Sequence, residues 1–280
     1  MLAVPNAAED APGGPAAEIA SIIGLDNPAM DIRVAKVDAA GHSDPAGIRS
    51  VLEEAAARRP AGAPSAIVVP LLASPHPGLM RAIREAITVS GANAYIGEVF
   101  NTNALLAEAL HIRLADAGLA RADRVRMFSI TTSADGIIVA TIGGQEAVGS
   151  AGLTSVLLAA RLALPVLPAS LDGPPSIEVQ AARLQEMGVT RIAIAPCVIG
   201  PEVPTGALEE AVSAVGGKSA APLGAHGNIV KLITAAYGQV LGQLKTADDS
   251  VQAPSAPAQH ERTRRSGLDE GQENVVDDLG

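Results

Sequence analysis

The chain has 280 residues, of which 48% are hydrophobic but only 1% aromatic, so its core must be built from alanine, valine, leucine and isoleucine. A net charge of −10 and the absence of tryptophan argue against binding to nucleic acid, which is a polyanion. No segment approaches the ~20 apolar residues of a membrane helix, and the first residues lack a signal-peptide pattern. The single cysteine, Cys197, excludes an internal disulfide. We therefore expect a cytoplasmic protein without membrane contact.

The first half of the chain alternates short apolar strands with amphipathic helices. Strands are predicted at residues 1–4, 32–37, 66–72 and 94–99, and helices at residues 15–23, 48–60, 79–87 and 105–118. Parallel strands need crossover connections, and helices of this length supply them. The pattern predicts a doubly wound parallel sheet within residues 1–120.

The second half repeats the alternation within residues 121–245. Strands are predicted at residues 136–141, 165–171 and 192–198. Helices are predicted at residues 153–162, 176–188 and 229–244, and a further helix is predicted to end at residue 215. Residues 142–149 contain several glycines and are predicted to form a loop. A second parallel-sheet lobe is therefore expected.

The tail, residues 246–280, differs in composition from both lobes. It holds eight acidic residues and three arginines, with little apolar periodicity. Such a composition cannot bury enough apolar surface to fold, so the tail is predicted to be disordered. Its negative charge makes it a candidate for contact with a protein partner.

One segment is repeated between the halves. Residues 65–78 combine a short apolar run with a loop of proline, serine and glycine, and residues 191–206 match them without a gap when 126 is added to the number. Pro70 corresponds to Pro196 in this match. The repeat predicts a duplicated domain, hence an α/β protein with two tandem doubly wound lobes of the flavodoxin type.

Ligands of open parallel sheets bind beyond the carboxyl ends of the strands. The loops predicted at this edge contain Asn6, Ser74, Gly143 and Gly144 as candidate ligand-binding residues, the last two because backbone N–H groups at a helix start can bind an anion. His76, His42 and Asp38 lie in loops at the same predicted edge of the first sheet. Imidazoles with a carboxylate are suitable ligands for a divalent metal.

Several segments resemble the class II tetrapyrrole chelatases, the sirohydrochlorin cobalto- and ferrochelatases, in the form with two fused lobes. The resemblance rests on Ala66-Ile-Val-Val-Pro-Leu-Leu, Asp135-Gly-Ile-Ile-Val-Ala, Pro174-Pro-Ser before a helix, and Ala221-Pro-Leu-Gly-Ala-His. It implies insertion of Co²⁺ or Fe²⁺ into a polycarboxylated tetrapyrrole in siroheme or cobalamin biosynthesis, with the metal as substrate and no other cofactor.

The family places one histidine after the first strand and a second in the loop after the strand that ends Val-Pro-Leu. Here the first position reads Val4-Pro5-Asn6, and a gapless match puts Gly78 at the second position, with His76 two residues earlier. The resemblance then implies that His76 acts as the catalytic residue and that Asp38 corresponds to the family's acidic residue after the second strand.

Three functions remain open from the sequence. The first is a working metal chelatase, that is, a lyase, with an altered site formed by His76, Asp38 and His42. Alternatively it is a pseudoenzyme that keeps the chelatase fold to bind a tetrapyrrole or a protein partner. The third reading is an α/β protein that binds a small molecule unrelated to tetrapyrroles.

Overall fold

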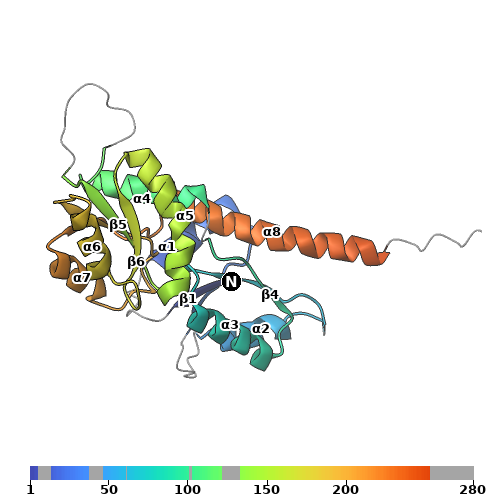
Figure 1. Ribbon diagram of the computed structural model, residues 1–280. Helices are drawn as coiled ribbons and strands as arrows, with labels where there is room; N and C mark the ends of the chain where they lie inside the picture. The colour runs from blue at the N-terminus through green and yellow to red at the C-terminus, as the bar shows by residue number, and fades with distance from the viewer. Residues whose placement is uncertain (6–13, 38–46, 61, 101–102, 122–132, 253–280) are drawn as a thin grey trace, which may run out of the picture.

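Each half of the chain forms a four-stranded parallel sheet in the structure, a computed structural model shown in Figure 1. It describes residues 1–5, 14–37, 47–60, 62–100, 103–121 and 133–252, with side chains described up to residue 246. The predictions for Asn6, Asp38, His42 and residues 253–280, including a protein contact through the tail, lie outside these ranges.

The two sheets have the same topology. The first has the strand order β2-β1-β3-β4, and the second the order β6-β5-β7-β8. The first-sheet strands are β1 (Leu2–Pro5), β2 (Val34–Val37), β3 (Ala66–Pro70) and β4 (Ala94–Ile96), and the second-sheet strands are β5 (Gly136–Thr141), β6 (Val166–Ser170), β7 (Ile192–Pro196) and β8 (Lys218–Ser219). Strands β3 and β7 begin and end 126 residues apart, so the predicted duplication is confirmed.

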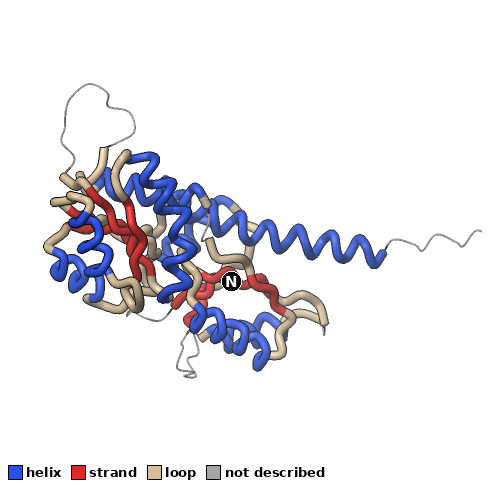
Figure 2. The backbone as a smooth tube through the Cα atoms, in the orientation of Figure 1, coloured by secondary structure: helices blue, strands red, loops and turns tan. Residues whose placement is uncertain are grey.

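Helices cover both faces of each sheet (Figures 1 and 2). They are α1 (Pro15–Asp26), α2 (Ile48–Ala57), α3 (Pro77–Ser90), α4 (Ala104–Asp116), α5 (Gly144–Leu162), α6 (Ile177–Glu186), α7 (Ala207–Val215) and α8 (Gly227–Gln252). Leu52 and Ile83 pack α2 and α3 on one side of the first sheet, and Ala181 and Leu184 pack α6 on one side of the second. The predicted fold class of two doubly wound lobes is confirmed.

The last helix of each half packs on the other half. Helix α4 follows the first sheet but contacts α5 and β7, whereas α8 follows the second sheet but contacts β3 and α1. One continuous core joins them, with Val69 and Leu110 from the first half and Ile137 and Ile233 from the second. The lobes therefore share buried surface, and a division at residue 120 stays a prediction.

Three local predictions were wrong. Helix α5 begins at Gly144, so most of the loop predicted at residues 142–149 is helical. Strand β8 was missed because it has only two residues, too few for a period. Helix α8 continues to Gln252, past the expected start of disorder at residue 246, because residues 245–252 lack glycine and proline and can extend a helix already held by packing. Within the described residues, no helix is long and apolar enough to cross a membrane.

Candidate functional site

The carboxyl edges of the two sheets meet through the loops after β3 and β5. A Cβ atom on Gly143 would lie 2.3 Å from the carbonyl oxygen of Pro75 and 3.2 Å from the Cα of His76. Gly143 also has a φ of +116°, which side-chain-bearing residues rarely adopt. Only glycine therefore allows the loop of the second lobe to approach the His76 loop this closely.

Asp172, in the loop after β6, holds the Gly143 loop in place. Its carboxylate accepts the N–H groups of Gly143 at 3.0 Å and Gly144 at 2.9 Å and the hydroxyl of Ser170 at 2.6 Å. Partial burial raises the pKa of Asp172, but these donors and the neighbouring His76 outweigh it and leave the pKa below its usual value. Asp172 is therefore an anion at neutral pH, and it occupies the N–H groups at the start of α5.

His76 begins helix α3 as its N-cap residue. Its Nδ1 atom accepts the N–H of Leu79 at 3.3 Å. A ring nitrogen that accepts a hydrogen bond carries no proton, so the neutral ring has its proton on Nε2. In this conformation neither nitrogen has a free lone pair for a metal, whereas Nε2 can donate to a ligand carboxylate.

Ser74, Cys197 and Glu202 form a buried polar group beside this contact. Burial raises the pKa of the Cys197 thiol to about 12, although a hydrogen bond with Ser74 opposes the shift. Glu202 is 2% exposed and accepts the N–H groups of Ile199 at 2.6 Å and Gly200 at 2.7 Å. Burial raises the pKa of Glu202 to about 6, and these bonds oppose it. Cys197 is thus an unreactive thiol, and Glu202 titrates near neutral pH.

The raised pKa of Glu202 predicts a stability that falls as the pH rises. The ordinary pKa is 4.5 and the folded value about 6, so the native state binds the extra proton between these two values. Stability from this group is full below pH 4.5 and is lost through pH 6, by about 2 kcal/mol. Urea unfolding from pH 4 to 7 should show this slope in the wild type and not in Glu202→Gln. Equal slopes in the two proteins would contradict the assignment.

A pocket of about 690 Å³ opens beside Asp172. It is lined by Gln145, Gly173, Pro174, Pro175, Ser176, Val179 and Arg183. The guanidinium of Arg183 is exposed and donates to Gln180 at 3.1 Å. Because Gln145 and Arg183 both carry N–H donors, this pocket suits a ligand with a carboxylate.

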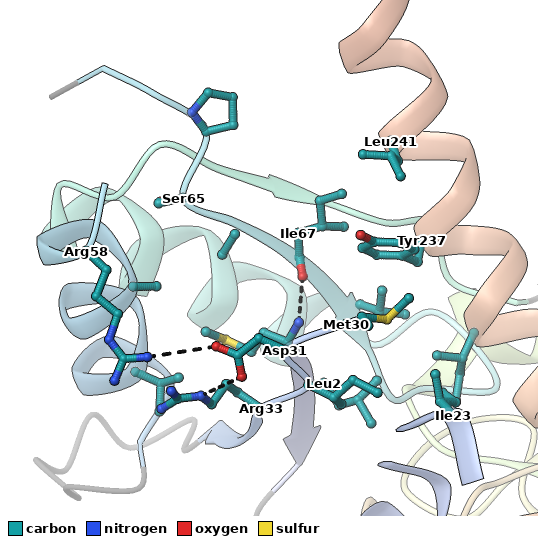
Figure 3. Close-up of a pocket in the computed structure, with 18 of the residues that line it drawn as sticks. Leu2, Ile23, Met30, Asp31, Arg33, Arg58, Ser65, Ile67, Tyr237 and Leu241 are labelled. Carbon is teal, nitrogen blue, oxygen red and sulfur yellow. Dashed lines mark hydrogen bonds and ion pairs between the residues drawn. The ribbon is translucent and has the colours of Figure 1, made fainter. Parts of the chain in front are cut away.

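A second pocket, of about 610 Å³, lies at the opposite, amino edge of β1 and β3, between the first lobe and α8 (Figure 3). Leu2, Ile67, Tyr237 and Leu241 contribute to its apolar wall. On its charged wall, Asp31 pairs with Arg33 at 3.1 Å and with Arg58 at 3.8 Å. These arginines are already neutralised, and the pocket is remote from the His76 loop.

Comparisons with solved structures find proteins of the same architecture. SirB from Bacillus subtilis with Fe³⁺ superposes with a TM-score of 0.63 at 14% identity, covering 88% of this chain and 96% of SirB. A complex of SirB, a sirohydrochlorin chelatase from the subspecies spizizenii, with cobalt gives a TM-score of 0.60 at 13% identity, with 88% and 96% covered. CbiX, the terminal enzyme of siroheme biosynthesis in denitrifying bacteria, gives 0.57 at 18% identity, with 85% and 97% covered.

The chain has the fold of the class II tetrapyrrole chelatases. The resemblance read from the sequence is confirmed at the level of the fold. No protein-family model matches the sequence, and no curated protein matches it either.

In this chelatase fold, four of the predicted site residues lie together at the edge where the sheets meet. They are Ser74, His76, Gly143 and Gly144. Within the described residues, no group of three or more His, Cys, Asp and Glu side chains is arranged to hold a metal ion. The metal site of His76, Asp38 and His42 stays a prediction, because two of its members are not described.

Sequence reasoning assigned no role to Asp172 or Glu202. Asp172 lies two residues after the end of β6, and an acidic residue just beyond a parallel strand was the available signal. For Glu202 the signal was its surroundings, since it is the single charged residue in the mostly apolar, proline- and glycine-containing loop of residues 197–206. Its hydrogen bonds to the backbone of Ile199 and Gly200 depend on the fold of this loop and cannot be predicted from composition.

Proposed function

We propose that this chain is a sirohydrochlorin chelatase-like protein, which binds a polycarboxylated tetrapyrrole where the sheets meet and inserts Co²⁺ or Fe²⁺ into it. The observation that carries the proposal is the contact of the His76 loop with Gly143, in a fold shared with SirB and CbiX. The pocket with Gln145 and Arg183 supports it, since a tetrapyrrole of this class presents carboxylates to such donors.

Metal insertion needs a group that binds the incoming ion and a base for the pyrrole protons. His76 can serve only if its bond from Leu79 breaks, which would release the Nδ1 lone pair. Asp172 is a weak base because its pKa is lowered. The pKa of Glu202, about 6, is better matched to proton transfer at neutral pH, but its carboxylate already accepts two backbone N–H groups.

A second candidate function is binding of a tetrapyrrole without catalysis. The cap formed by His76 favours it, because this bond withdraws the imidazole from metal chemistry and gives it a structural role. Asn6, at the position where the family has its first histidine, favours it as well.

The two candidates differ in the expected effect of His76 variants on Co²⁺ insertion into sirohydrochlorin, followed by the absorption spectrum. His76→Asn keeps an acceptor at the N-cap but removes the imidazole, whereas His76→Ala removes both. A catalytic imidazole predicts turnover by the wild type and at least a 100-fold loss in both variants. Spectral changes that report tetrapyrrole binding, with no turnover in any of the three proteins, would establish binding alone. Absence of both signals would overturn the proposed function.

A further inference from the structure

The pocket between the first lobe and α8 is separate from the proposed tetrapyrrole site. It lies at the amino edge of β1 and β3, the edge opposite the His76 loop (Figure 3). Helix α8, from the second half of the chain, closes a hollow between α1, α2 and β3 of the first half. Its volume of about 610 Å³ is in the range of small-molecule sites, which are concave and mostly apolar with a few polar groups.

One wall of this pocket is apolar. Helix α8 contributes Tyr237, Leu241 and Leu244, which share one face of the helix at spacings of four and three residues. Strand β3 and helix α2 contribute Ile67 and Val51. All five side chains are only partly buried, and Figure 3 shows Tyr237 and Leu241 extending from α8 toward Ile67. An apolar chain laid on this wall would remove the exposed surface from water, which favours its binding.

The other wall carries a network of ion pairs with one arginine left over. Arg33 donates to Asp31 at 3.1 Å and to Glu54 at 3.2 Å, and Arg58 pairs with the same two acids. These four charges sum to zero. Arg59 also lines the pocket, but its guanidinium makes no hydrogen bond or ion pair with any residue that the structure describes. Because Arg59 is exposed, this spare positive charge lies at the mouth of the pocket.

We propose that the pocket binds a single-chain amphipathic carboxylate, such as a fatty acid, with its apolar chain on the α8 wall and its carboxylate on Arg59. A guanidinium offers a carboxylate two parallel N–H donors, and the acids of the pocket are already paired with its other arginines. The amine of Met1 donates to the Ile67 carbonyl at 2.9 Å, and burial lowers its pKa to about 6, so it is mostly uncharged at pH 7.4. Arg59 is therefore the charge that selects an anion over a cation.

Calorimetric titration of the full chain with fatty acids at pH 7.4 and about 0.15 M salt, where the net charge is screened beyond ~8 Å, tests the site. We expect dodecanoate to bind once per chain at micromolar concentration. Decanoate should bind about tenfold more weakly because it buries two fewer CH₂ groups. Dodecyltrimethylammonium, with the same chain and a positive head, should bind at least tenfold more weakly than dodecanoate. Absence of dodecanoate binding up to about 1 mM, or equal binding of the anion and the cation, would overturn the proposal.

Arg59→Gln tests the residue assigned to the carboxylate. It should weaken dodecanoate binding at least fivefold and remove most of the preference over dodecyltrimethylammonium. Arg49→Gln is the matched control, since Arg49 is on α2, pairs with Glu53 and does not line the pocket. An equal loss in both variants would show a general effect of net charge and would refute the role of Arg59.

The two tyrosines of the chain locate the bound ligand. Because the chain has no tryptophan, its ultraviolet fluorescence comes from Tyr95 and Tyr237. Tyr237 lines the pocket, whereas Tyr95 is in β4 and does not. Dodecanoate should change the emission of the wild type and of Tyr95→Phe but not that of Tyr237→Phe, which keeps the ring for packing. A change that persists without Tyr237 would place the ligand elsewhere and contradict the proposal.

A pair of α8 variants tests the apolar wall. Leu241→Asp should weaken dodecanoate binding at least tenfold, whereas Gln243→Asp should not, because Gln243 is exposed and outside the pocket. Excess sirohydrochlorin should leave dodecanoate bound, since the two proposed sites are at opposite edges of the first sheet. Displacement by sirohydrochlorin, or equal effects of the two variants, would overturn the separate site without bearing on metal insertion.

Discussion

Replacement of Gly143 by alanine is expected to lower the free energy of unfolding by about 3–5 kcal/mol. The methyl group would force a φ of +116° on alanine and would lie 2.3 Å from the carbonyl oxygen of Pro75. A backbone oxygen cannot rotate away as a side chain does, so the loops after β3 and β5 must separate by about 1 Å. Because these loops belong to different lobes, the strain acts directly on the contact between them.

Gly144→Ala provides the matched control for this prediction. Gly144 also has a positive φ, of +65°, and also donates its N–H to Asp172, but nothing lies within 4 Å of its Cβ position. Its substitution should cost only roughly 1–2 kcal/mol, from backbone strain. Chemical unfolding of the three proteins measures the difference. Losses of equal size would show that the close approach to Pro75 adds nothing to stability.

The duplicated architecture could be predicted because its signal is local. The runs at residues 66–70 and 192–196 are apolar, short and separated from helices by proline and glycine, and these features alone define parallel strands in an α/β chain. The positions of Ser74, His76 and Gly143 at the carboxyl edge followed from the same topology, since parallel strands present all their carboxyl ends on one side.

The contacts across the lobes could not be predicted in this way. The close approach of the Pro75 carbonyl to Gly143 depends on how the two sheets, far apart in sequence, are placed. The exchange of α4 and α8 between lobes depends on which apolar faces fit together, and periodicity shows only that such faces exist. The cap at His76 was missed because histidine is not among the residues preferred at helix starts, so its position in a loop looked like that of a ligand.

Removal of the Asp172 carboxylate is the second change with a large expected effect. Asp172→Ala should lower the free energy of unfolding by about 3 kcal/mol, because the charge-assisted bonds from Gly143, Gly144 and Ser170 are lost and the N–H groups must find water instead. The folded pKa lies below the unfolded one, so the native state binds fewer protons. The stabilisation is therefore complete above the unfolded value of 3.8 and is lost as the pH falls through the folded value.

Asp135→Ala is the control for Asp172→Ala. It tests whether an effect of Asp172→Ala on binding comes from lost stability or from the position of Asp172 at the site. Asp135 accepts the N–H groups of Thr190 at 3.1 Å and Arg191 at 2.7 Å in a similar cluster, but it precedes β5 and so lies at the amino edge of the sheet. Both variants should unfold at lower urea concentration between pH 5 and 8. Only Asp172→Ala should also weaken tetrapyrrole binding, since it releases Gly143 from the His76 loop. If Asp135→Ala weakened binding as much, loss of stability alone would explain both results and the edge would have no special role.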